Sequence, residues 1–124
     1  MSNMENITIR ILSEDARRPE QYRTRFHKLY ASKVIELQPK CIHRVPIDVH
    51  ISAKRGTGIV YYPTKRLEQC KIGCAGYWNP EDPSKEMVLI LFNSNKHRVL
   101  VDKHDHIGFI SLSDHELPIS GPSI

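Results

Sequence analysis

The sequence lacks the features that mark membrane, secreted and disulfide-stabilised proteins. No stretch approaches the ~20 consecutive apolar residues that a membrane-spanning helix needs. Residues 1–6 have neither the basic start nor the apolar centre of a signal peptide, so we expect an intracellular protein. The cysteines number only three, an odd count without the density of a disulfide scaffold, which is typical of a reducing compartment.

The sequence is also poor in net charge. Its 18 Lys and Arg residues and 14 Asp and Glu residues give +4, and the two signs are interleaved. This distribution favours a mixed solvated surface over a site dedicated to polyanions. Disordered chains combine low hydrophobicity with high net charge, whereas 40% of these 124 residues are hydrophobic. We therefore predict one folded domain with a packed core.

Alternating apolar and polar residues, typical of strands with one buried face, are the dominant pattern. Residues 7–11 alternate in this way, and so do residues 44–51 around Pro46, which predicts an edge or a bulge there. Short β-branched or apolar runs bounded by turn formers follow at residues 58–62, 87–92, 98–101 and 106–112. The only predicted helical turn lies within residues 15–26. The patterns predict an all-β domain of the sandwich or barrel type.

Residues 92–110, FNSNKHRVLVDKHDHIGFI, form an apolar strand ending in Asn, a turn, a second strand and a second turn. This run resembles, without a gap, the one that leads to Gly-Asp-Arg-Ile-Ala-Gln in the trimeric dUTP pyrophosphatase (dUTPase) family. Residues 47–67 keep the spacing of that family's strand, loop and Pro-Arg-Ser-Gly-Leu motif. Residues 29–39 resemble its Asp-Leu-Tyr-Ser motif and next strand, and residues 76–79 lie where it has Gly-Val-Ile-Asp.

The resemblance extends over about residues 11–112. It implies a single-domain, dUTPase-like jelly-roll β-barrel over residues 1–112, followed by a short tail, residues 113–124, in place of the family's glycine-rich closing arm.

The resemblance places substituted residues at the family's catalytic positions. The carboxylate that activates the attacking water corresponds to Asn79, whose neutral amide does not accept a proton at physiological pH. The Asp that organises the magnesium waters corresponds to Lys28, whose ammonium repels a cation. Glu81 and Asp82 follow Asn79, so a shifted hairpin that presents either carboxylate is the alternative that restores a base.

The phosphate-binding positions are substituted as well. Thr64, Lys65 and Arg66 stand where the family has Arg, Ser and a Gly that lets backbone amides approach phosphate oxygens. Phe109 stands in place of a Gln, while Asp105 is the retained Asp of Gly-Asp-Arg-Ile. We therefore expect a pseudoenzyme: a dUTPase-like scaffold without catalysis and without a cofactor, in which Mg²⁺ is needed only if the enzyme alternative holds.

Inactive, pruned members of this family are typical of large DNA viruses. The resemblance thus implies a viral regulatory or interaction module that binds host proteins in the host cytoplasm or nucleus. The alternative is a dUTP-binding or weakly active dUTP pyrophosphatase, which forms dUMP and pyrophosphate with Glu81 or Asp82 as base. Family members are threefold symmetric, and for this chain a homotrimer, a dimer and a monomer all stay open.

A zinc site would need four side chains from two segments to meet, namely Cys70, Cys74, His104 and His106. The spacing of the two cysteines is compatible with a zinc site but does not favour one. Small buried thiols and a polar turn are the favoured interpretation.

Single-stranded nucleic acid is a third class of ligand, since basic residues stand on both sides of two tyrosines: Lys54, Arg55, Tyr61, Tyr62, Lys65, Arg66 and Lys71. Neighbouring residues of a strand point to opposite faces, so only one tyrosine can join such a surface. We therefore predict that nucleic-acid binding is the less favoured function.

Overall fold

The structure is a computed structural model that describes residues 7–53 and 57–113. Within these ranges the regular secondary structure is almost entirely strand. The elements, in chain order, are β1 (Ile7–Ile11), β2 (Glu20–Arg23), β3 (Phe26–Tyr30), β4 (Ile35–Leu37), β5 (Ile42–Val45), β6 (Val49–Ala53), β7 (Gly58–Pro63), α1 (Lys65–Gln69), β8 (Ile72–Trp78), β9 (Val88–Asn93), β10 (Val99–Val101) and β11 (His106–Ser113).

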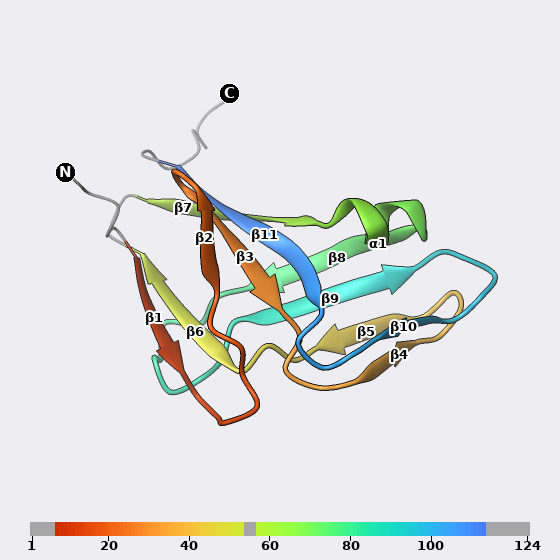
Figure 1. The fold of residues 1–124 in the computed structure, drawn as a ribbon, viewed down its shortest axis with the longest axis horizontal. Helices are drawn as coiled ribbons and strands as arrows, with labels where there is room; N and C mark the ends of the chain where they lie inside the picture. The colour runs from red at the N-terminus through yellow and green to blue at the C-terminus, as the bar shows by residue number, and fades with distance from the viewer. Residues whose placement is uncertain (1–6, 54–56, 114–124) are drawn as a thin grey trace.

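The described strands all pair antiparallel. β1 pairs with β6 and β10 with β4, while two larger sheets have the orders β2-β3-β11-β7 and β5-β9-β8. In Figure 1 the four-stranded sheet lies across the three-stranded one, and buried side chains of both belong to one core cluster. The predicted all-β class is confirmed.

The core follows from alternation along the strands. In β9, Leu89 and Leu91 are fully buried and alternate with half-buried neighbours, and in β11 Ile110 is buried between half-buried residues. Each such side chain contributes about 1.5–3 kcal/mol through burial. Asn93 continues the buried row of β9, and its Nδ2 donates hydrogen bonds to Leu37 O (2.8 Å) and His97 O (2.9 Å). The retained Asn therefore joins the β9–β10 turn to β4.

Two sequence predictions about local structure are wrong. Residues 44–51 do not form one strand, because β5 ends at Val45 and Asp48 has a left-handed φ of 53°. The alternation continues through the break because Ile47 is as buried as Val45 and Val49. No helical turn lies within the described residues 15–26, where β2 forms instead; the helix is α1.

β8 lies at the edge of its sheet, and within the described residues only β9 pairs with it. Most of its side chains are exposed, and Gly73 and Gly76 have open space where a Cβ would stand. The predicted tail, residues 113–124, lies outside the described residues except for Ser113, the last residue of β11. Among the described residues, no helix has the length and apolar character to cross a membrane.

Candidate functional site

The predicted phosphate-binding residues lie at the start of α1. Thr64 is its N-cap and accepts a hydrogen bond from Leu67 N at 3.2 Å, as capping threonines do. Lys65 is exposed. Arg66 donates a hydrogen bond to Leu100 O at 3.0 Å, and its guanidinium lies 3.7 Å from Asp105 Oδ2. Thr64 and Arg66 thus both have partners within the chain.

Asp105 organises the turn that precedes β11. Its Oδ2 accepts a hydrogen bond from Asp102 N at 2.9 Å, and its backbone O accepts one from Ala31 N at 3.0 Å. The structure therefore brings Arg66 and Asp105 together, in a contact that joins α1 to this turn.

Asn79 follows β8 and turns its amide toward β6. Its Nδ2 donates to Ile51 O at 2.6 Å, while its buried Oδ1 has no hydrogen-bond partner among the described residues. Within the same residues, no hydrogen bond or ion pair joins Asn79 to Lys28, Arg66 or Asp105. The Asn79 amide thus serves to hold the β8–β9 hairpin against β6.

The two carboxylates after Asn79 have different environments. Glu81 is exposed. Asp82 Oδ1 accepts hydrogen bonds from Ser84 N (2.9 Å) and Ser84 Oγ (2.8 Å), and these hold the pKa of Asp82 below its ordinary value. Asp82 therefore caps its own loop and is a weaker base than an ordinary aspartate.

The four candidate zinc ligands do not form a site. Cys70 is half-buried and Cys74 is exposed, whereas His104 Nε2 lies 2.8 Å from Asp15 O and His106 Nε2 lies 3.0 Å from Gly108 O. No group of three or more His, Cys, Asp or Glu side chains within the described residues could hold a metal ion.

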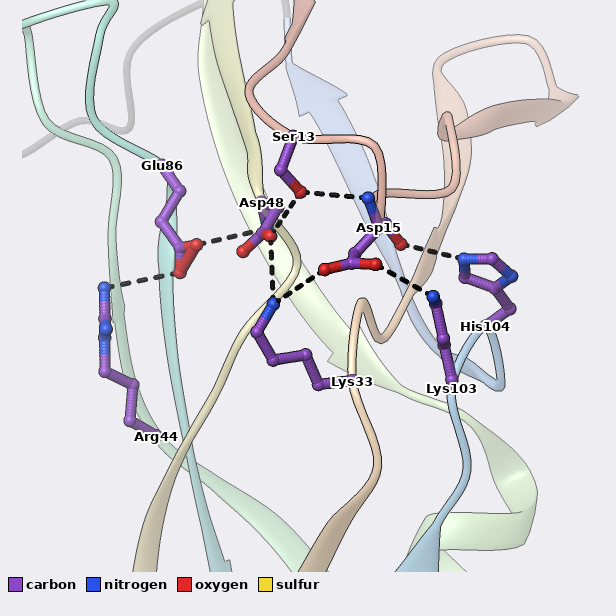
Figure 2. A network of polar contacts seen from close by, with 8 residues as sticks. All are labelled: Ser13, Asp15, Lys33, Arg44, Asp48, Glu86, Lys103 and His104. Carbon is purple, nitrogen blue, oxygen red and sulfur yellow. Dashed lines mark hydrogen bonds and ion pairs between the residues drawn. The ribbon is translucent and has the colours of Figure 1, made fainter.

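A polar network that the sequence patterns missed joins five distant segments of the chain (Figure 2). The Asp15 carboxylate lies between the ammonium groups of Lys33 (3.2 Å) and Lys103 (2.9 Å), whose hydrogen bonds hold the pKa of Asp15 below its ordinary value. Ser13 Oγ donates to Asp48 Oδ2 at 2.6 Å, and Lys33 lies 3.6 Å from the same oxygen.

Glu86 is the least exposed carboxylate of this network. Its Oε2 accepts a hydrogen bond from Asp48 N at 3.1 Å, and its Oε1 lies 3.3 Å from Arg44. Burial, and then the neighbouring Asp48, raise the pKa of Glu86. A cleft of about 440 Å³ is lined by these residues together with Trp78 and Pro80 of the β8–β9 hairpin. The cleft is thus lined by acidic and basic side chains and by the exposed indole of Trp78.

A second cavity, of about 180 Å³, lies on the outer face of the four-stranded sheet. Each of the four strands contributes one aromatic ring to it, and we call these residues the aromatic face: Tyr22, Phe26, Tyr62 and Phe109. Phe109 is the register partner of both Lys28 and Tyr62. Two predicted site residues, Lys28 and Phe109, are therefore neighbours here and lie beside rings that the sequence patterns did not connect.

The rings of this region contact one another and nearby cations. Tyr22 and Phe109 lie 5.3 Å apart between centroids, and His106 meets Phe109 edge-on at 4.7 Å. The cationic groups of Arg23 and Lys28 lie 5.1 and 5.2 Å from the Tyr22 ring centroid, within the range of cation–π attraction.

No family model matches the chain, and no curated protein does. Among solved structures, the dUTPase of phage phi11 of S. aureus matches with a TM-score of 0.75 at 14% identity, over 95% of this chain and 93% of that chain. The chain has the dUTPase fold. The dUTPase of Staphylococcus bacteriophage 80alpha with dUpNHpp gives a TM-score of 0.72 at 14% identity, over 95% of this chain and 85% of that one.

A D95N mutant of the phi11 dUTPase, solved to study the coordination of a structural Mg(II) ion, gives a TM-score of 0.73 at 13% identity, over 95% of this chain and 94% of that one. The likeness confirms the dUTPase-like fold that residues 92–110 and the other motifs predicted. The roles of the individual positions within this dUTPase fold stay predictions.

Proposed function

We propose that this dUTPase-fold protein does not hydrolyse dUTP and acts in a virus-infected cell, in the cytoplasm or nucleus, as a regulatory module that binds host proteins. The observation that carries the proposal is Asn79. At the position that the resemblance assigns to the family's general base it offers a neutral amide, and its Nδ2 is already bonded to Ile51 O at 2.6 Å. An amide cannot take a proton from the attacking water at neutral pH.

Two other substituted positions support the same proposal. Lys28 brings a positive charge to the place where the resemblance expects a magnesium-organising Asp, and its ammonium lies beside the Tyr22 ring. The guanidinium of Arg66 is engaged by Leu100 O and Asp105. A phosphate group would have to compete with both contacts.

A regulatory role is known for a protein of the same fold. The 80alpha phage dUTPase is described as controlling the transfer of virulence genes by a proto-oncogenic G protein-like mechanism. The fold thus accommodates regulation in that protein, which supports an interaction role for this one.

The alternative function is binding or slow hydrolysis of dUTP with Glu81 or Asp82 as base. The 440 Å³ cleft beside the β8–β9 hairpin supports it, because a nucleoside needs a concave site of this order. The low pKa of Asp82 and its two hydrogen bonds to Ser84 oppose it.

A single assay series separates the two functions. Pyrophosphate release from dUTP with Mg²⁺ is measured for this chain, with the phi11 dUTPase as the active control and a Glu81→Gln, Asp82→Asn double variant to test the alternative base. We expect no release above background and no saturable heat on titration with dUpNHpp. Release within about a hundredfold of the control, lost in the double variant, would establish the alternative.

The assembly is a further part of the proposal. Because the members of the family that this chain resembles are threefold symmetric, we propose a homotrimer, with a mass about three times that of the 14.3 kDa chain by light scattering after size exclusion. The mass of a single chain or of a dimer would remove the threefold assembly from the proposal.

A further inference from the structure

The aromatic face has the arrangement of a stacking platform. Its rings come one each from four adjacent antiparallel strands, and they border a cavity of about 180 Å³, which is large enough for one planar ring. Tyr22 and Tyr62 are about half exposed, at 48% and 49%. Exposed rings gathered in one place on a surface are typical of sites that bind a ligand or partner.

The charges around the face are mainly positive. Arg23 and Lys28 lie beside the Tyr22 ring, and Arg17 stacks on Tyr30 at 3.8 Å on the same sheet. The neighbouring carboxylate, Glu20, is engaged by the Tyr30 hydroxyl at 2.7 Å and by Arg17 at 3.6 Å. The ligand that complements this surface carries negative charge next to flat rings.

Two kinds of occupant fit this description less well. A second copy that meets this face with its own across a twofold axis would bring like charges of Arg23 and Lys28 together, which is unfavourable. An acidic protein segment supplies negative charge, but only an occasional ring. Single-stranded nucleic acid supplies a planar base and a phosphate at every step, and aromatic rings bind its bases whatever their sequence.

We propose that the aromatic face, with Arg23 and Lys28, binds single-stranded nucleic acid. This site shares only Tyr62 with the basic and aromatic set predicted from the sequence, of which Lys54 and Arg55 lie outside the described ranges. Alternation along a strand predicts that only one of the two tyrosines lies on the outer surface. That residue is Tyr62, since Tyr61 is only 4% exposed. The three further rings come from distant segments that only strand pairing brings beside Tyr62.

The test uses the full chain and a fluorescein-labelled twelve-nucleotide thymidine oligomer, with a uridine oligomer of the same length as a second arm. Fluorescence anisotropy should give a micromolar Kd at about 50 mM salt for at least one of them. Two phosphate contacts, from Arg23 and Lys28, predict a slope of log K against log salt of about −1.4.

Three variants separate stacking from charge. Tyr62→Ala removes an exposed ring and should weaken binding about tenfold with the salt slope unchanged. Phe109→Leu keeps apolar volume and should weaken binding in the same way. Arg23→Gln should reduce the slope by about 0.7. Leu100→Ala is the matched control, because Leu100 is an apolar side chain of the same exposure (48%) on β10, outside the four-stranded sheet; its removal should change nothing.

The proposal is overturned if neither oligomer binds at about 50 mM salt, if Tyr62→Ala binds as the parent does, or if a twelve-residue glutamate peptide competes as well as unlabelled oligomer. Circular dichroism of each variant shows that a loss of binding is not a loss of fold. A chain that binds the oligomer and also hydrolyses dUTP keeps this inference and loses the proposed function, so the two fail separately.

Discussion

Gly108 in β11 has no room for a side chain. A Cβ at this position would overlap the Tyr61 ring and approach Tyr62 O to 2.5 Å, in the place where Tyr61 donates its hydroxyl hydrogen bond to Ile107 O at 2.7 Å. Gly108→Ala should therefore lower the free energy of unfolding by about 3 kcal/mol, as overpacking does. Urea titration measures this loss. In the same titration, Gly73→Ala, whose added Cβ meets no atom within 4 Å, should leave the free energy of unfolding unchanged. Equal losses in both variants would contradict this packing.

His27 makes the stability of the fold dependent on pH. Its ring is 8% exposed, its Nδ1 has no partner among the described residues, and burial lowers its pKa. The unfolded chain takes up the proton more readily, so this contribution to stability is complete above about pH 6.5 and is lost as the pH falls below it.

We expect His27→Leu to flatten the decrease in melting temperature between about pH 6.5 and pH 5. His97→Gln, a change at an exposed histidine, serves as the control and should leave the decrease unchanged. His106, whose pKa burial also lowers, contributes to the slope that remains. An unchanged slope in His27→Leu would refute the assignment.

At the scale of elements, α1 depends on its cap. The helix has only five residues and one fully buried side chain, Leu67, so the hydrogen bond from Leu67 N to Thr64 Oγ1 is a large part of what holds it. Thr64→Ala should cost about 1 kcal/mol in chemical denaturation, and Thr64→Ser should restore most of it. A similar cost for both substitutions would point to packing of the Thr64 methyl group instead of its hydroxyl.

Alternation predicted β1, and short β-branched or apolar runs predicted β7, β9, β10 and β11. These five strands form where the patterns placed them. The sequence patterns did not predict β2, because all four of its residues are exposed. They did not predict α1 either, because five residues with a single apolar side chain, Leu67, are too few to show a helical period.

The candidate site was predictable only position by position. Lys28 and Phe109 were selected from the motifs, yet their adjacency follows from strand register. The aromatic face and the network around Asp48 assemble residues from distant segments, a relation that no local pattern encodes.

At the scale of the whole molecule, Asp48 fastens segments that are far apart in the chain. It has a left-handed φ of 53°, accepts a hydrogen bond from Ser13 and donates its N–H to Glu86. Although burial acts against its charge, the Ser13 hydrogen bond and the Lys33 ammonium hold the pKa of Asp48 below its ordinary value.

Asp48→Ala should therefore destabilise the protein by about 2 kcal/mol, through the lost acceptor and the strained backbone. Asp48→Asn, which tolerates the left-handed conformation, should cost about half of this. Thermal unfolding of the two variants side by side measures the difference, and a milder effect of alanine than of asparagine would argue against this role.

The edge of β8 has a consequence for handling the protein. From Ile72 to Trp78 the strand carries no charge and no proline, it is mostly exposed, and its glycines leave backbone groups accessible. Natural sheets protect such edges with lysines, prolines or bulges, and here the one bulge, between Cys74 and Gly76, is the available protection. Concentrated solutions should therefore form β-rich aggregates that grow by strand addition at β8. A single lysine introduced by Ala75→Lys should slow this aggregation without altering the fold.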